Sequence, residues 1–173
     1  MPARLSRPTL LSSDDFHTVV RLAPLVSIDL IIRNSRGEVL LGLRNNEPAR
    51  GFYFVPGGII LKQERLHDAF ARILKRETNY DASLEDARLL GVYEHFYDAN
   101  SCGHKNFSTH YVVLAHELKL ANASAPKFDA QHSEMRWWGE RDLLVSDRVH
   151  ENTKAYFRRS QGKSSGRADK VNE

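Results

Sequence analysis

Residues 54–79 read FVPGGIILKQERLHDAFARILKRETN, and this stretch decides the fold of the chain. The apolar residues at 52–55 predict a short strand that stops at the Pro-Gly-Gly sequence of residues 56–58. After a five-residue loop, apolar residues recur at helical spacing, which predicts an amphipathic helix over residues 64–78. Asn79 is suited to the left-handed conformation that ends many helices. The stretch thus predicts a strand, a Gly-Gly loop and a helix in succession.

One carboxylate of this helix falls in an unfavourable place. At about 100° per residue, Glu77 points into the middle of the apolar stripe, beside Leu66 and Phe70. Burying a carboxylate there is costly unless it is paired, and the dipole of the last helical turn disfavours it by about 0.3–1 kcal/mol. Two interpretations remain open: a cation lies close to Glu77, or the helix frays before Glu77 and the side chain turns into water.

The glycine pair before the helix bears on this choice. Glycines allow the backbone to approach a ligand closely, as phosphate and metal sites require. A Gly-Gly turn alone is more often a plain turn. A strand, a Gly-Gly loop and a helix with an inward carboxylate form a more specific combination, and together they favour a cation near Glu77.

The rest of the chain surrounds this unit with strands and helices. Further strands are expected at residues 25–33, 38–44, 89–97, 109–120 and 135–138, and helices at 16–20 and 149–158. This order indicates a mixed α/β layered domain. We expect one domain up to about residue 160, with an N-terminal extension over about residues 1–14 and a flexible basic tail over residues 161–173.

Composition limits the classes of function. With 173 residues the chain suits one domain, and its net charge of +3 is too scattered for a nucleic-acid-binding face. We find neither an apolar run of about 18 residues nor the apolar core of a signal peptide, so no membrane association is expected. Cys102 is the single cysteine and cannot form an intrachain disulfide. A soluble, cytoplasmic protein is therefore predicted.

The deciding stretch resembles the Nudix box. In that pattern a glycine is followed by five residues, Glu, seven residues, Arg-Glu, an aliphatic residue, any residue, Glu-Glu, any residue and Gly. Gly58, Glu64 and Arg72 fall at the matching spacings, and Glu77 matches the last glutamate. The resemblance implies a Nudix α/β/α sandwich with a central mixed sheet.

Three positions depart from the box. Ile73 and Arg76 stand where two acidic residues are usual, and Asn79 replaces the final glycine. A helix with one remaining carboxylate should hold fewer metal ions than a standard Nudix pyrophosphatase. This reduced box is similar to that of one branch of the family, the GDP-mannose mannosyl hydrolases.

The likeness to that branch extends over roughly residues 15–157. The matching blocks are DF at 15–16, LVS at 25–27, NSRGE at 34–38, FVPGG at 54–58, HFYD at 95–98, THYVVL at 109–114, QH at 131–132 and VH at 149–150. Because the blocks occur in order, an accidental resemblance is not expected.

The resemblance implies one Mg²⁺ per subunit, or Mn²⁺ in its place. Its ligands would be the backbone carbonyl of Gly57, the carboxylate of Glu77 and the side-chain oxygen of Gln131, a set of hard oxygen donors. Arg44 and Arg72 would neutralise or position the nucleotide diphosphate.

The same resemblance assigns the sugar side of the site. Asp29 and His95 would contact the sugar or its bridging phosphate, and Tyr111 would support the leaving oxygen. His132 would be the general base that activates water. From pattern alone, His132 would be a solvated loop residue, Tyr111 a core residue, and His95 either core or functional.

Two aromatic residues and one substitution complete the set. Phe16 and Tyr97 are candidates for stacking on guanine, and the branch implies a homodimer. Similar enzymes carry an arginine where this chain has Ile59, so another cation, such as Lys62 or Arg65, would have to compensate.

We therefore expect hydrolysis of GDP-mannose, or of GDP-glucose, to GDP and free sugar. Water would attack the anomeric carbon with inversion while GDP leaves, a reaction for which one metal ion on the leaving group suffices. Two alternatives remain open. The protein could cleave between the phosphorus atoms, giving GMP and a sugar 1-phosphate, or it could be a non-catalytic nucleotide-sugar-binding regulator.

Overall fold

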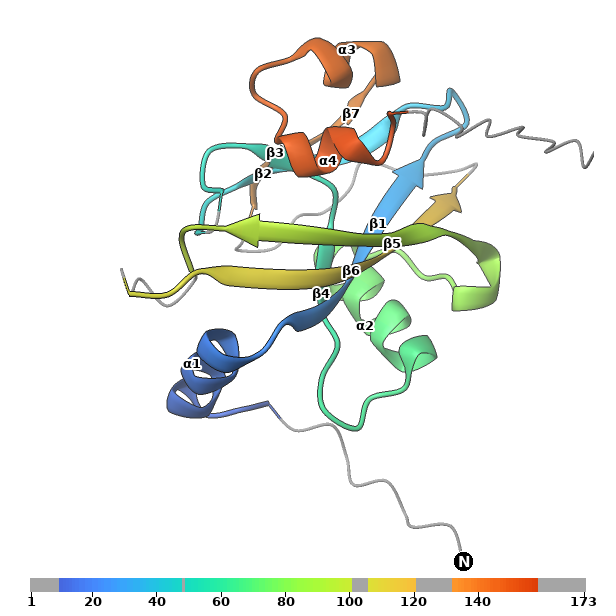
Figure 1. Ribbon diagram of the computed structural model, residues 1–173. Helices are drawn as coiled ribbons and strands as arrows, with labels where there is room; N and C mark the ends of the chain where they lie inside the picture. Colours follow the sequence, from blue (N-terminus) through green and yellow to red (C-terminus); the bar gives the residue numbers. More distant parts are fainter. Residues whose placement is uncertain (1–9, 48, 101–105, 121–131, 159–173) are drawn as a thin grey trace, which may run out of the picture.

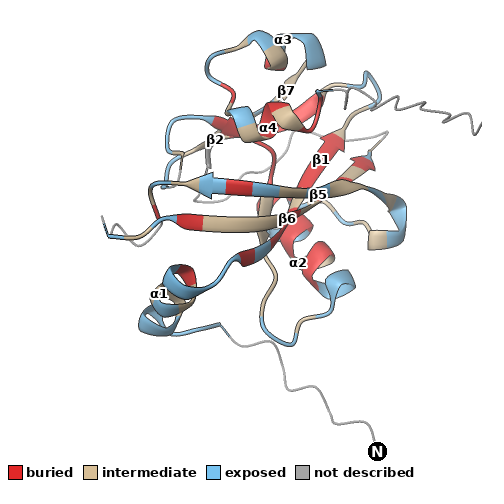
Figure 2. Ribbon diagram, viewed as in Figure 1, coloured by how far each residue is buried: buried red, intermediate tan, exposed pale blue. Residues whose placement is uncertain are grey.

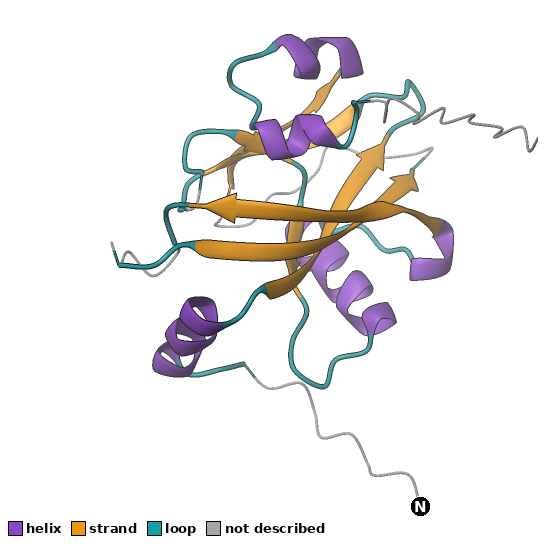
Figure 3. Ribbon diagram, viewed as in Figure 1, coloured by secondary structure: helices purple, strands orange, loops and turns teal. Residues whose placement is uncertain are grey.

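The computed structural model describes residues 10–47, 49–100, 106–120 and 132–158. Its strands are β1 (Leu25–Arg33), β2 (Val39–Arg44), β3 (Tyr53–Phe54), β4 (Gly57–Ile59), β5 (Ala87–Tyr97), β6 (Thr109–Lys119) and β7 (His132–Trp138). Its helices are α1 (Ser13–Leu22), α2 (Leu66–Thr78), the 3-10 turn η1 (Leu84–Asp86), α3 (Glu140–Val145) and α4 (Glu151–Ala155). The seven strands form one mixed sheet with helices on both faces, as Figures 1 and 3 show. The predicted α/β/α sandwich is thereby confirmed.

Strand β1 is central to the sheet. It pairs in parallel with β6 from Leu25–Tyr111 to Arg33–Lys119, while β4 pairs with it on the other side, antiparallel. The path runs β3-β2-β1-β6-β5, and β7 adds to β2. Such a strand reads as a nearly continuous apolar run because both of its faces are covered.

Two hydrophobic clusters lie on the two faces of β1. Ile28 and Leu30 pack with Phe70 of α2, whereas Ile31 packs with Leu143 of α3 and with Phe157 after α4. Figure 2 shows the buried residues concentrated on β1 and on the sheet-facing side of α2. Because side chains alternate along a strand, Asp29 lies on the same face as Ile31, toward α4.

Some elements differ from the sequence-based expectation. The glycine pair belongs to a strand, β4, rather than to a loop, because Gly57 and Gly58 pair with Asp29 and Ile28. Helix α3 was not expected, since six residues are too few for a periodic signal. Leu66 was placed in the apolar stripe but is 37% exposed, at the first position of α2.

No helix in the described ranges is both long and apolar enough to cross a membrane. Residues 1–9 of the expected extension and the expected basic tail over residues 161–173 lie outside the described part of the chain, as does Cys102.

Candidate active site

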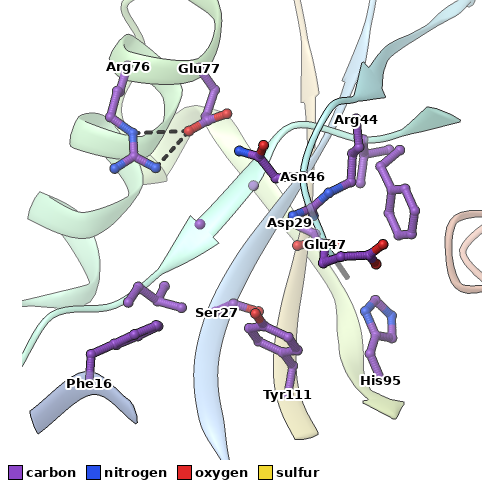
Figure 4. Close-up of a pocket in the computed structure, with 15 residues that line it drawn as sticks. Phe16, Ser27, Asp29, Arg44, Asn46, Glu47, Arg76, Glu77, His95 and Tyr111 are labelled. Atoms are coloured by element: carbon purple, nitrogen blue, oxygen red, sulfur yellow. Dashed lines mark hydrogen bonds and ion pairs between the residues drawn. The ribbon is translucent and has the colours of Figure 1, made fainter. Parts of the chain in front are cut away.

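A cavity of about 310 Å³ opens between α1, the C-terminal end of α2 and strands β1, β4 and β5 (Figure 4). Seven of the residues selected from the sequence line it: Phe16, Asp29, Arg44, Gly57, Glu77, His95 and Tyr111. The structure therefore brings together residues that are far apart in the chain, on elements from α1 to β6.

Helix α2 supplies the first wall of the cavity. Glu77 is 1% exposed, and Arg76 donates to its Oε1 atom from Nε at 3.0 Å and from Nη2 at 2.8 Å. The helix continues to Thr78 and ends at Asn79, whose φ of 62° confirms the left-handed cap. The helix therefore does not fray before Glu77, and the cation expected near this carboxylate is its neighbour Arg76.

Arg72 holds the loop before α2 rather than lining the cavity. Its guanidinium donates to Glu64 at 2.6 and 2.8 Å and to the backbone carbonyl of Ile59 at 2.9 Å. Glu64 also accepts a hydrogen bond from the amide of Leu61 at 2.9 Å. Because Ile59 lines the cavity, these contacts fix one edge of the site from outside it.

Strand β1 supplies the second wall, where Asp29 packs against Gly57. A Cβ atom at position 57 would lie 2.5 Å from Asp29 Oδ1 and 2.8 Å from the carbonyl oxygen of Ile28, so only glycine fits there. Asp29 keeps part of its surface in the cavity, yet its carboxyl group is enclosed by protein atoms. Burial raises the pKa of Asp29 from 3.8 to about 6, against the opposing effects of a hydrogen bond from Tyr156 and the charge of Arg44.

Tyr156 links two of the selected residues. Its hydroxyl donates to Asp29 Oδ2 at 2.6 Å and lies 3.1 Å from His95 Nε2. When Asp29 is ionised the single hydroxyl hydrogen points to the carboxylate, so Nε2 of His95 is the donor in the second contact. Burial, helped by His150, lowers the pKa of His95 to about 4, so its ring is neutral at pH 7.

Tyr156 was not among the residues selected from the sequence, although it lies within the helix expected over residues 149–158. Its contact with Asp29 spans 127 positions of the chain. Tyr97 was selected but does not line the cavity, because its ring stands edge-on to Tyr111 and His95 at centroid distances of 6.0 and 6.3 Å. Burial raises the pKa of Tyr97 to about 12.

Two further selected residues are Gln131 and His132. Gln131 is outside the described residues. His132 is the first residue of β7 and the Cα partner of Arg44, at a register shift in the β2–β7 ladder. The backbone therefore brings residue 132 beside a strand position that lines the cavity.

The metal ligands that the resemblance implies are of the kind that suits a hard divalent cation. Among the described residues, no three His, Cys, Asp or Glu side chains gather as a metal-binding group. The expected ligands are instead Glu77, the backbone of Gly57 and a side-chain amide, all of them oxygen donors of the kind that Mg²⁺ prefers. A guanidinium already lies on Glu77 Oε1, where a positive charge is therefore accommodated.

A sheet between helices, with arginines and a buried carboxylate at one cavity, defines an α/β/α protein whose site suits phosphate groups. The NUDIX domain model matches residues 23–159, so the chain belongs to the Nudix family of hydrolases. It is 42% identical over 128 residues to the low-salt glycan biosynthesis protein Agl8 of Haloferax volcanii, covering 74% of this chain and 79% of that protein.

Solved structures show the same fold. The MutT protein from Methanosarcina mazei Go1 superposes with a TM-score of 0.65 at 20% identity, over 78% of this chain and 91% of that chain. The NUDIX domain of NrtR from Shewanella oneidensis, solved with ADP ribose, gives a TM-score of 0.60 at 19% identity, over 85% and 97% of the two chains. At these identities the likeness concerns the fold alone.

Proposed function

We propose that the protein hydrolyses a GDP-sugar, GDP-mannose or GDP-glucose, to GDP and free sugar, as a homodimer with one Mg²⁺, or Mn²⁺, in each subunit. The observation that carries this proposal is that α2 offers the cavity a single carboxylate, Glu77. At the two box positions that are usually acidic, α2 carries Ile73, which is buried in the core against the sheet, and Arg76, which is a cation. The relative Agl8 is named for glycan biosynthesis, which agrees with an activated sugar as substrate.

On the leaving-group side, Glu77, the Gly57 carbonyl and Gln131 would hold the metal ion. When bound, that ion stabilises the negative charge that develops on the departing GDP. Arg44 lines the cavity and would bind the diphosphate by charge-assisted hydrogen bonds. Arg72 contributes indirectly, because it donates a hydrogen bond to the backbone carbonyl of Ile59, which lines the cavity.

On the sugar side, the chain supplies a neutral His95 and an Asp29 that takes up a proton near pH 6. Asp29 and His95 would hydrogen-bond the sugar hydroxyls, and Tyr111 would support the oxygen between sugar and phosphate. His132 would accept a proton from water that attacks the anomeric carbon on the face opposite to GDP, which gives inversion. Phe16 lines the cavity and offers a ring to the base, with Tyr97 behind Tyr111.

The test is to incubate the protein with GDP-mannose and Mg²⁺ in ¹⁸O-labelled water and to identify the products by phosphorus NMR and mass spectrometry. We expect GDP without label and mannose carrying it. His132→Gln should lower kcat by about 10²–10⁴-fold while leaving GDP-mannose binding intact. His67→Gln is the matched control, since His67 is 55% exposed on α2, and it should leave kcat unchanged.

A second candidate is cleavage between the phosphorus atoms. Two further carboxylates, Asp29 and Glu47, line the cavity with Glu77. The three do not gather as a metal-binding group among the described residues, so this reaction would need the side chains to move together around the metal ions. In that case the same experiment gives GMP and mannose 1-phosphate, with the label in one of the phosphates.

A third candidate is a non-catalytic nucleotide-sugar-binding regulator. It is favoured by Ile59, an apolar residue at the cavity where similar enzymes carry an arginine. Retained Mg²⁺-dependent binding of GDP-mannose without turnover would support it, and Ile59→Arg would then be the first substitution to test for a gain of activity.

A further inference from the structure

Arg76 lines the cavity but has no place in the reaction described so far. It follows Lys75 near the end of α2, and its two hydrogen bonds both go to one oxygen of the next residue, Glu77. Neighbouring positions on a helix point about 100° apart, so the Arg76 side chain must turn back across the helix end to reach this oxygen. Figure 4 shows the fork between the two side chains at the edge of the cavity.

We propose that Arg76 is a mobile phosphate ligand. While no divalent cation is bound it neutralises Glu77, and when the cation takes Glu77 the guanidinium moves to the terminal phosphate of a nucleoside diphosphate. The inference rests on the proposed function only in assuming that the ligand carries a diphosphate.

The burial of the two partners supports the first half of this exchange. Glu77 is 1% exposed, and a carboxylate so enclosed needs a positive charge beside it. The side chain of Arg76 is 48% exposed, so packing does not lock it in place. One partner is fixed by the helix, and the other is free to leave.

Charge supports the exchange itself. A divalent cation on Glu77 would be the largest local charge in the site, and it would repel a guanidinium that shares the same oxygen. The two cations therefore compete for the carboxylate of Glu77. Displacement of Arg76 releases the Nε and Nη2 groups that donate to Glu77, and the planar guanidinium then has the geometry that suits phosphate oxygens.

The residues around the cavity support a phosphate position for the displaced Arg76 guanidinium. Arg44 faces the cavity from β2 and Arg76 from α2, so a diphosphate bound near Gly57 and Gly58 would lie between two guanidinium groups. Lys62 and Arg65, which the sequence suggested as replacements for the charge missing at Ile59, do not line the cavity. Arg76, at a box position that is usually acidic, supplies a positive charge to the cavity from α2.

The experiment measures two affinities of the full chain by calorimetry, for Mn²⁺ alone and for GDP in the presence of Mg²⁺. For Arg76→Ala we expect Mn²⁺ to bind more tightly, by about fivefold or more, because a competing charge is gone. We expect GDP to bind about 10–100-fold more weakly, the loss of one charge-assisted contact. GMP, which lacks the terminal phosphate, should change less than GDP.

Lys75→Ala is the matched control. Lys75 adjoins Arg76, carries the same charge and is 49% exposed, but it pairs with Asp81 and does not line the cavity. It should leave both affinities within about twofold. Arg76→Gln keeps a hydrogen-bond donor for Glu77 without the charge, so it should behave as Arg76→Ala even if the alanine variant folds poorly.

Opposite shifts in the two affinities would support the exchange. If Arg76 only positioned Glu77, both Mn²⁺ and GDP would bind more weakly, and that result overturns the inference. Unchanged affinities overturn it as well. Because neither measurement needs turnover, failure to hydrolyse GDP-mannose would sink the proposed function alone, and turnover with unchanged GDP affinity in Arg76→Ala would sink this inference alone.

Discussion

Glu77 and Asp29 are carboxylates on different walls of one cavity, and their partners differ in kind. On α2, Glu77 is met by the permanently charged guanidinium of Arg76. On β1, Asp29 is met by the hydroxyl of Tyr156, a neutral donor shared with His95. The first arrangement places a positive charge beside Glu77, while the second lets Asp29 take up a proton near pH 6.

This difference suits the two walls of the cavity to different chemical groups. The α2 wall is prepared for positive charge, so a metal ion or a guanidinium can occupy it. On the β1 wall Asp29 meets Tyr156, which follows α4, and near it lies a neutral His95 of β5. These groups suit uncharged hydroxyl groups such as those of a sugar. A ligand with an anionic end and a polar, uncharged end would match the two walls.

The largest expected effect comes from removing charge on the α2 wall. Glu77→Gln should lower kcat by on the order of 10²–10³-fold, because it removes the charged ligand of the metal ion that would stabilise the leaving group. Steady-state kinetics with GDP-mannose checks this, with Glu94→Gln, at an exposed position of β5, as the control. Activity within threefold of the unmodified protein would mean that Glu77 has no part in the reaction.

The corresponding amide substitution on the β1 wall, Asp29→Asn, should make the fold more stable at neutral pH. The folded pKa of Asp29 is raised, so its contribution to stability is full below pH 3.8 and is lost as the pH rises through about 6. Asp29→Asn removes that loss and should stabilise the fold at pH 7 by up to about 3 kcal/mol. Urea unfolding at pH 7 and pH 4 tests this, since the gain should nearly vanish at pH 4. Equal gains at both values would contradict the titration of Asp29.

Removing the hydroxyl that Tyr156 shares between Asp29 and His95 should change stability less than Asp29→Asn does. Tyr156→Phe leaves Asp29 and His95 without their common partner and should destabilise the fold by about 1–3 kcal/mol. Its loss should also raise the pKa of Asp29, because the hydrogen bond now lowers that pKa. Chemical denaturation and carboxyl NMR titration measure the two effects. Tyr93→Phe, in edge contact with the Tyr156 ring, is the control that keeps the shared hydroxyl.

His95 should oppose Asp29 in the pH dependence of stability. Its folded pKa is lowered from 6.5 to about 4, so its contribution is present above pH 6.5 and is lost as the pH falls through 4. The two residues nearly cancel between pH 4 and 6, where the unmodified protein should show a flat profile from this pair. In Asp29→Asn stability should rise with pH across this window, and in His95→Gln it should fall. Parallel slopes in the two variants would refute the pairing.

The smallest effect is expected outside the cavity. Arg72→Lys keeps the charge but cannot reach Glu64 and the Ile59 carbonyl together, so the loss should be about 1 kcal/mol or less. Hydrogen exchange should quicken at the amide of Leu61, which Glu64 holds. Unchanged exchange there would mean that the loop is held by other contacts.

Much of the fold follows from local patterns in the sequence. Strand β1 was expected at its observed bounds, and the helical periodicity placed Glu77 against the core with a cation nearby. The glycine pair was assigned to a loop because its partner strand, β1, is almost thirty positions away in the chain. Local patterns carry no information about such pairings.

The site was predictable only in part for the same reason. Asp29, His95 and Tyr111 were selected through a resemblance, whereas Arg76 was noted only as a departure from the box. Tyr156 escaped because nothing in its own segment marks a contact with Asp29, and a tyrosine at the end of an amphipathic helix usually packs in the core. The partner of a functional residue is set by the tertiary fold.

The parallel pairing of β1 with β6 also affects how the chain is made. Asp29 leaves the ribosome 127 residues before Tyr156, which at about 5–20 residues per second is an interval of roughly 6–25 s. For the first part of that time β1 lacks β6, its long-range strand partner, and for nearly all of it β1 lacks α4, which is made last. An apolar strand without partners can join another nascent chain, so this interval is when the protein is most exposed to aggregation and most in need of chaperones.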